Sequence, residues 1–292
     1  ATSVDERFTR FDRHPGYQQL KMMREGGKRL GIPDPFFKVH ESTAGATTVI
    51  GGRECINFAS YNYLGLAHHP KVIQAGIDAL NRYGSSVSAS RPVSGERPIH
   101  HELERAIAET YEVEDAVAFV SGHATNVSTL GYLLGPKDLI LHDEYIHNST
   151  VVGAQLSGAR RMSFAHNDPA ALETLLTDDA CRRRLADAAI PLLQADGAER
   201  VVVIEGLYSM DGDAPDLKRF VEIKQRHQAW LMVDEAHSFA VMGDRGLGLR
   251  EYCGVPAGDV ASPVHRARID HDDLVVAVVL PLDPFEQARK VL

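Results

Sequence analysis

Short apolar runs that alternate with helical segments constrain the fold of this 292-residue chain most strongly. Strands that alternate with helices indicate βαβ units, and so a mainly parallel α/β sheet flanked by helices. Each run is too short to be a helix and is followed by a polar residue or a small one. The expected strands are Ala116–Val120, Leu139–Leu141, Arg161–Phe164, Val201–Ile204 and Leu231–Val233.

The N-terminal part of the chain has a different pattern. A helix is expected to begin near residue 15, with a linker rich in Pro and Phe at Ile32–Phe37. Thr47–Ile50 and Cys55–Phe58 are predicted to pair as a hairpin around Gly51-Gly52, a two-residue turn signal. Further helices are expected over 70–83 and 100–111, with one or two surface helices over 169–200.

These patterns predict three regions. Residues 1–55 would form an N-terminal arm and hairpin, and residues 56–260 a large domain that holds the site. Residues 261–292 remain an unassigned tail or the remnant of a small C-terminal domain that is otherwise largely missing.

Composition narrows the classes of function. The chain is 44% hydrophobic and 24% charged, which is enough for a sizeable core. A formal net charge of -9 argues against a nucleic-acid surface. No apolar stretch is long enough to span a bilayer, and no secretory signal is recognised. The three cysteines, Cys55, Cys181 and Cys253, lie far apart without metal or disulfide spacing, so a cytoplasmic location is expected.

The segment Leu231–His237 carries the clearest chemical signal. An apolar run ends at Asp234, and His237 follows three residues later. A carboxylate at the end of a buried strand is costly unless a cation meets it. The pyridinium nitrogen of pyridoxal 5'-phosphate (PLP) is such a cation, and it needs an Asp to stay protonated. The alternative is a strand-end Asp that caps the next turn.

Other strands also end in polar groups, where ligands of parallel sheets bind. Ser121–Asn126 leads from an expected strand into a helix, whose N-terminal amides favour a phosphate. His147 could place its ring over a flat cofactor, and Ser209 could donate to a ring or phosphate oxygen. An ordinary turn and a solvated His cap remain the alternatives.

Seven sequence blocks make the chain resemble the α-oxoamine synthases from about residue 15 to residue 260. These are PLP-dependent acyltransferases of fold type I. The blocks are Phe58–Leu66, Gly84–Gly95 with His101–Glu104, Ser121–Asn126, His147–Ser149, His166–Asp168, Glu205–Pro215, and Asp234–His237 with Gly243–Gly248.

The resemblance implies roles for residues that would touch PLP. Asp234 would pair with the pyridinium nitrogen, His237 would bond the ring hydroxyl oxygen, and His147 would stack on the ring. The remaining cofactor contacts would come from Gly122 and His123 through backbone amides, and from Ser209 with Glu205 close by. The family often has an aromatic residue at the position of His123.

Substrate-side roles follow from the same resemblance. Asn62 would lie near the substrate amino acid, while Ser90 and Arg91 would approach the partner subunit's site. The implied reaction is decarboxylative condensation of an amino acid with an acyl thioester, from CoA or a carrier protein, to give an α-amino ketone. A homodimer is implied too. An aminotransferase or aldolase of the same fold type would share the role of Asp234 but would not explain Gly84–Gly95 and the His147 block together.

The sequence departs from the family pattern at the lysine that forms the family's Schiff base with PLP. No lysine stands between Lys224 and Lys290, and Lys290 lacks the family motif. Family similarity ends after Val260, although Val275–Leu280 could be one strand of a remnant. Three explanations compete: a fragment or dropped segment, a truncated or frame-altered product, and a lysine-less, non-catalytic partner subunit.

Overall fold

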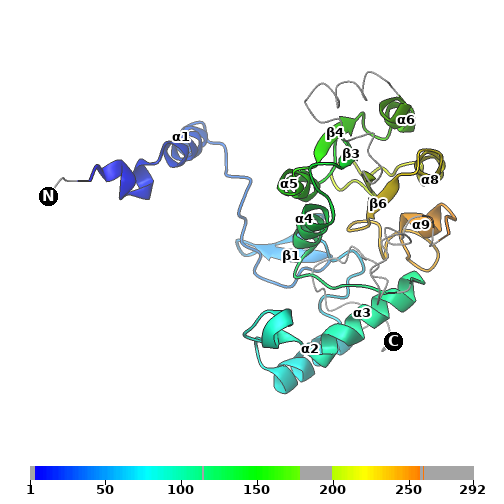
Figure 1. Cartoon of the computed structure of the whole chain (residues 1–292). Coiled ribbons are helices and arrows are strands. Elements are labelled where there is room, and N and C mark those ends of the chain that lie inside the picture. Colours follow the sequence, from blue (N-terminus) through cyan, green and yellow to red (C-terminus); the bar gives the residue numbers. More distant parts are fainter. Residues whose placement is uncertain (1–3, 114, 178–198, 257–258, 260–292) are drawn as a thin grey trace. The chain divides into compact units, whose positions relative to one another are not determined.

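The computed structural model describes residues 4–113, 115–177, 199–256 and 259. They fall into two compact units, one that ends at Tyr61 and one that begins at Asn62. Figure 1 shows the elements of each unit coloured along the sequence. The expected tail from residue 261 onward, including Lys290, lies outside the described residues.

The first unit contains helical turns η1 (Glu6–Phe8) and η2 (Phe11–Arg13), helix α1 (Pro15–Arg29) and strands β1 (Thr47–Ile50) and β2 (Arg53–Ile56). The two strands pair antiparallel, with Ile50 opposite Arg53. Gly51 and Gly52 have φ of 57° and 71°, and two successive positive φ values suit the tight hairpin turn that glycine adopts without strain. The predicted hairpin is confirmed, with its second strand beginning at Arg53.

A parallel sheet organises the second unit. Strands β3 (Leu139–Asp143), β4 (Arg160–Phe164), β5 (Arg200–Glu205) and β6 (Trp230–Asp234) pair in the order β4-β3-β5-β6. Every pairing between them is parallel. Four of the five predicted strands are therefore confirmed, and the α/β class with them.

Helices cover both faces of this sheet. Figure 1 shows α4 (Gly122–Leu133) and α5 (Asn148–Ser157) on one side, and α6 (Pro169–Thr177) and α8 (Leu217–Arg226) on the other. Alternate strand residues supply the two faces, because successive side chains of a strand point in opposite directions. Leu141 packs toward α6 and α8, whereas its neighbour Ile140 packs toward α4 and α5.

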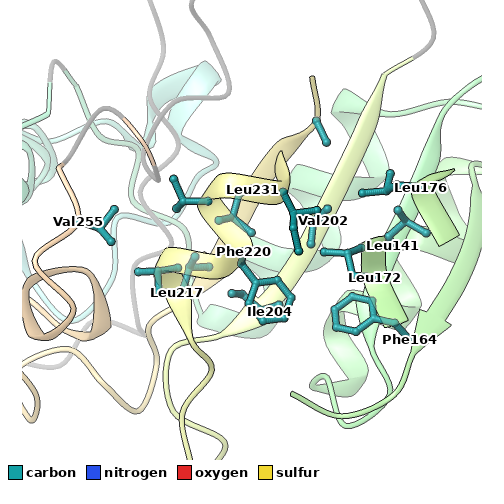
Figure 2. Close-up of a cluster of buried hydrophobic side chains, with 14 of the residues drawn as sticks. Leu141, Phe164, Leu172, Leu176, Val202, Ile204, Leu217, Phe220, Leu231 and Val255 are labelled. Carbon is teal, nitrogen blue, oxygen red and sulfur yellow. The ribbon is translucent and has the colours of Figure 1, made fainter. Parts of the chain in front are cut away.

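The larger core cluster lies between the sheet and helices α6 and α8. Figure 2 shows Leu172 of α6 and Phe220 of α8 among strand side chains such as Val202 and Ile204. All four are fully buried, and a fully buried side chain of this size stabilises the fold by roughly 1.5–3 kcal/mol. The helix expected after residue 169 is thus α6, whose inner face enters the core. Residues 178–198 lie outside the described part.

The remaining helices are α2 (Pro70–Tyr83), η3 (Arg91–Gly95), α3 (Pro98–Tyr111) and α9 (Leu249–Tyr252). The predictions of helices over 70–83 and 100–111 are confirmed by α2 and α3. None of the described helices combines the length and the apolarity that a membrane crossing requires.

The prediction of a strand at Ala116–Val120 is wrong, because these residues form no strand in the described structure. The backbone of Ala118 bonds to side chains instead of a neighbouring strand. Its N–H donates to Glu104 Oε1 at 2.9 Å, and its carbonyl accepts from Arg91 Nη1 at 3.2 Å. The predicted burial of the segment's apolar residues is confirmed for Ala116, which packs in a small cluster with Leu103 of α3.

Candidate active site

Three carboxylic acids lie at the carboxyl ends of adjacent strands. Asp143 ends β3, Glu205 ends β5 and Asp234 ends β6. Glu205 and Asp234 are register partners. Their exposed fractions are 0%, 5% and 6% in chain order. Three buried acids at one sheet edge require nearby donors or cations, since burial of charge is costly.

Asp234 and Glu205 accept hydrogen bonds from neutral donors. Ala236 N–H donates to Asp234 Oδ1 at 3.0 Å, and Asn126 Nδ2 donates to Asp234 Oδ2 at 2.8 Å. His147 N–H donates to Glu205 Oε1 at 2.7 Å.

No positively charged side chain is paired with Asp234 or Glu205 among the described residues. Burial, and next the charge of Asp234, raises the pKa of Glu205 to about 7. Neither acid forms a salt bridge within the part of the chain that the structure describes. The two strand ends therefore have the electrostatics of a site that a cation would complete.

His147 stands beside this pair as the N-cap residue of α5. Its ring Nδ1 accepts from Ser149 N–H at 3.2 Å and lies 2.7 Å from Ser149 Oγ. The ring itself is exposed. The His123 ring meets it edge-on, with centroids 6.4 Å apart and an interplanar angle of 87°. Two predicted residues are thus brought together, and His147 is exposed.

His237 contacts an unpredicted residue. Tyr63 Oη lies 2.6 Å from His237 Nδ1, and the rings meet at 63°. Burial lowers the pKa of His237 despite the opposing charge of Asp234, so the imidazole is mostly neutral at pH 7. Asn62 makes the adjoining turn, where its Oδ1 accepts from Ala67 N–H at 3.1 Å.

The N-terminus of α4 supplies backbone donors near His123. Ser121 Oγ accepts from Ala124 N–H at 3.1 Å, and Ser121 carbonyl accepts from Thr125 N–H at 2.9 Å. The amides of Gly122 and His123 come before these in the first turn. Such amides, together with the helix dipole, favour an anionic ligand.

Three other predicted residues stand apart from the hydrogen bonds around Asp234 and His147. Ser209 is exposed in the loop after β5, and no hydrogen bond links it to that network among the described residues. Ser90 precedes the five-residue η3. Arg91 contacts Glu104 Oε1 and Glu96 Oε2, each at 2.6 Å. Because both carboxylates occupy its guanidinium, its role toward a substrate stays a prediction.

A second acidic cluster surrounds His166. Its Nδ1 lies 2.8 Å from Asp143 Oδ1, and its Nε2 lies 3.0 Å from Asp213 Oδ2. Tyr145 stacks on the imidazole and Tyr208 meets it edge-on, with centroids 4.4 and 4.5 Å away. Burial lowers the pKa of His166, but the bonds and charges of Asp143 and Asp213 together raise it.

Glu235 fixes the chain on the other side of Asp234. Its carboxylate accepts from Leu249 N–H at 3.0 Å and from Ser238 Oγ. The same carboxylate fills the space that a Cβ at Gly206 or at Gly248 would need. Glu235 therefore connects the turn after β5, the turn after β6 and the start of α9.

Sequence reasoning missed Asn126, Ser149 and Tyr63 as members of the site. Each belongs to a block already quoted for the family resemblance. Asn126 and Ser149 close their blocks, and Tyr63 lies inside Phe58–Leu66. A polar residue at the end of its block was the available signal for Asn126 and Ser149, and Tyr63 had no such signal.

Comparison with known proteins identifies the family. The model of the aminotransferase class I and II family matches residues 53–263. The chain belongs to this family. Its place among the α-oxoamine synthases, PLP-dependent proteins of fold type I, follows from the relatives.

Two proteins that resemble this chain illustrate its place among the α-oxoamine synthases. An 8-amino-7-oxononanoate synthase from Trichlorobacter lovleyi is 41% identical over 206 residues, which cover 70% of this chain and 49% of that protein. The solved serine palmitoyltransferase of Sphingomonas wittichii is 32% identical with a TM-score of 0.74, over 84% of this chain and 58% of that one. The chain thus spans about half the length of the curated relatives that it matches.

Proposed function

We propose that this family member acts in the PLP-dependent condensation of an amino acid with an acyl thioester, with loss of CO2, to give an α-amino ketone. The observation that carries the proposal is the buried pair Glu205 and Asp234, which has no salt-bridge partner in the described structure and lies next to His147, whose backbone N–H donates to Glu205. A protonated pyridine ring is a planar cation, and its N–H can donate to a carboxylate of this pair. The α-amino ketone product is supported by the names of the relatives.

Each side chain would have a separate task toward the cofactor. Asp234 would hold the proton on the ring nitrogen, because an ionised carboxylate stabilises the adjacent cation. His147 would cover one face of the ring. The amides of Gly122 and His123 would hold the phosphate at the start of α4.

His237 and Glu205 would affect the hydrogen bonding and the protonation of the site. His237, held by Tyr63 at 2.6 Å, would meet the ring hydroxyl oxygen as a neutral imidazole. Glu205, with a pKa of about 7, can hold or release a proton near neutral pH beside Asp234. When bound, PLP supplies an electron sink for the carbanion formed at the α-carbon of the amino acid.

Asn62, Ser90, Arg91 and Ser209 complete the proposal as substrate-side and phenolic-side residues. We infer a homodimer and a cytoplasmic location with them, the first from the family resemblance and the second from three cysteines without disulfide spacing. The acyl donor would be a CoA or carrier-protein thioester.

A non-catalytic partner subunit is the second candidate. It is favoured by one observation, the lack of any lysine between Lys224 and Lys290. Such a chain would bind PLP without a covalent bond and would support a catalytic relative.

Titration with PLP, followed by borohydride, separates the candidates. Visible absorbance that borohydride bleaches supports a Schiff base and the enzyme, whereas absorbance without bleaching supports the non-catalytic subunit. Free thiol released from an acyl-CoA only when glycine, alanine or serine is present would confirm the condensation. Absence of any PLP binding at millimolar concentration would refute both.

A further inference from the structure

Four side chains form a continuous line of hydrogen bonds beneath the proposed cofactor site. Asn126 Nδ2 donates to Asp234 Oδ2 at 2.8 Å and also to Ser149 Oγ at 2.9 Å. Ser149 Oγ lies 2.7 Å from His147 Nδ1. Asn126 and Ser149 are 1% and 0% exposed. Water therefore has little access to the middle of the line.

The chemistry of the groups fixes the direction of every bond. An ionised carboxylate only accepts, so the amide of Asn126 must present its nitrogen to Asp234. The second N–H of that nitrogen then donates to Ser149 Oγ. Because this oxygen already accepts, its own proton is available for His147 Nδ1.

The backbone agrees with this direction. Ser149 N–H donates to the same His147 Nδ1 at 3.2 Å. Two donors thus converge on Nδ1, which must carry a lone pair and no proton. A neutral imidazole then has its proton on Nε2.

We propose that Asn126 and Ser149 are positioning residues that set the protonation of the proposed PLP site. Asn126 keeps Asp234 as an accepting carboxylate, and Ser149 holds His147 in the tautomer with its proton on Nε2. The imidazole that would cover the cofactor ring is therefore neutral, with one outward donor. We call this line of four side chains the relay. Its role toward PLP rests on the proposed function, but its geometry does not.

The tautomer of His147 is measured directly in the protein without cofactor. Long-range proton–nitrogen NMR correlations of histidine-labelled protein distinguish a proton on Nε2 from a proton on Nδ1. The wild type should show a single neutral form with the proton on Nε2. Ser149→Ala should add a detectable fraction of the other tautomer, because only the backbone donor remains.

Thr150→Val is the matched control for Ser149→Ala. Thr150 is the next residue of α5, is fully buried, and its Oγ1 has no hydrogen-bond partner in the described structure. Its replacement deletes a buried hydroxyl from the same helical turn but should leave the His147 signals unchanged. A proton on Nδ1 in the wild type, or equal spectra for Ser149→Ala and wild type, would overturn the proposal.

Asn126→Asp tests the other end of the relay. An Asp at this position has no N–H, so two carboxylates would face each other and one must take up a proton. PLP affinity should fall by about tenfold or more, as expected when a bond to a charged group is lost. Unchanged affinity in the folded variant would refute the role of Asn126. A wild-type protein that shows the Nε2 tautomer yet binds no PLP would refute the proposed function and leave the relay intact.

Discussion

Two pairs of acids near the carboxyl ends of the strands differ in how their charge is balanced, and only Asp213 among the four is exposed. Asp143 and Asp213 share the imidazole of His166, whose pKa they raise against the effect of burial. Asp234 and Glu205 receive only neutral donors from the described residues, and the pKa of Glu205 rises to about 7. The first group includes its own cationic partner, while the second has none among the described residues. This difference in electrostatics is why we propose the second pair, and not the first, as the ligand site.

Removal of Asp234 should have the largest effect on ligand binding. Asp234→Ala deletes the charge that the ring nitrogen would meet, and PLP affinity should fall by about 100-fold or more. The readout is a spectrophotometric PLP titration. Asp213→Ala, which removes an acid from the balanced cluster, is the control and should retain affinity within about twofold. Equal losses in both variants would contradict the distinction between the clusters.

Glu205→Gln should stabilise the protein without cofactor at alkaline pH. The pKa of Glu205 rises from an ordinary 4.5 to about 7 in the folded state, so the folded protein binds a proton that the unfolded chain releases. Wild-type stability is therefore lost as pH rises through that window. Glutamine removes this loss, and the gain in unfolding free energy at pH 8 should be about 3 kcal/mol.

Urea unfolding at pH 5 and pH 8 measures this effect. The gain should be small at pH 5, where the wild-type carboxyl is still protonated in the folded state. A gain that is the same at both pH values would contradict the assignment to Glu205.

His166→Gln should have the opposite effect on stability. The buried Asp143 would lose its partner charge, and unfolding free energy should fall by about 2 kcal/mol at pH 6. Because the folded pKa of His166 lies above its ordinary value, its contribution is present below about pH 6.5 and is lost as pH rises further. The deficit measured by urea unfolding should therefore shrink at pH 9. PLP affinity should change little.

Tyr63→Phe should have the smallest effect. It removes the hydroxyl that lies 2.6 Å from His237 Nδ1, and PLP affinity should fall only about threefold to tenfold, because a neutral hydrogen bond is lost. The same PLP titration measures it. Tyr61→Phe, which changes an exposed neighbour, provides the comparison. An effect as large as that of Asp234→Ala would show that the contact between Tyr63 and His237 contributes as much to binding as Asp234 does.

Sequence reasoning located the strand ends well, because apolar runs end where polar residues begin. Asp234 and Glu205 followed from that rule, and so did the position of His147. The contact between Asn126 and Asp234 did not, since 108 residues separate them and only the packing of α4 on the sheet joins them. Side-chain pairing of this kind depends on strand order, which local patterns do not contain.

The segment Ala116–Val120 illustrates the opposite error. Its composition suits a strand, but a strand also needs a neighbour with unpaired backbone groups. Glu104 and Arg91 take the hydrogen bonds of Ala118 instead. Arg91 itself was expected at a partner's site because its motif matched, whereas its carboxylate neighbours only became visible in three dimensions.

The Glu235 carboxylate limits the order in which this region can change in evolution. Gly206 has an ordinary φ, so its backbone would tolerate alanine, but Glu235 and Ser238 occupy the space of the new methyl group. Both side chains must therefore move or become shorter before a side chain can appear at 206. Gly248 does not gain the same freedom, because its φ of 80° still favours glycine. Sequences that descend from this one therefore reach alanine at 206 only after changes at 235 and 238, and the change at 235 removes the carboxylate that accepts from Leu249 N–H at the start of α9.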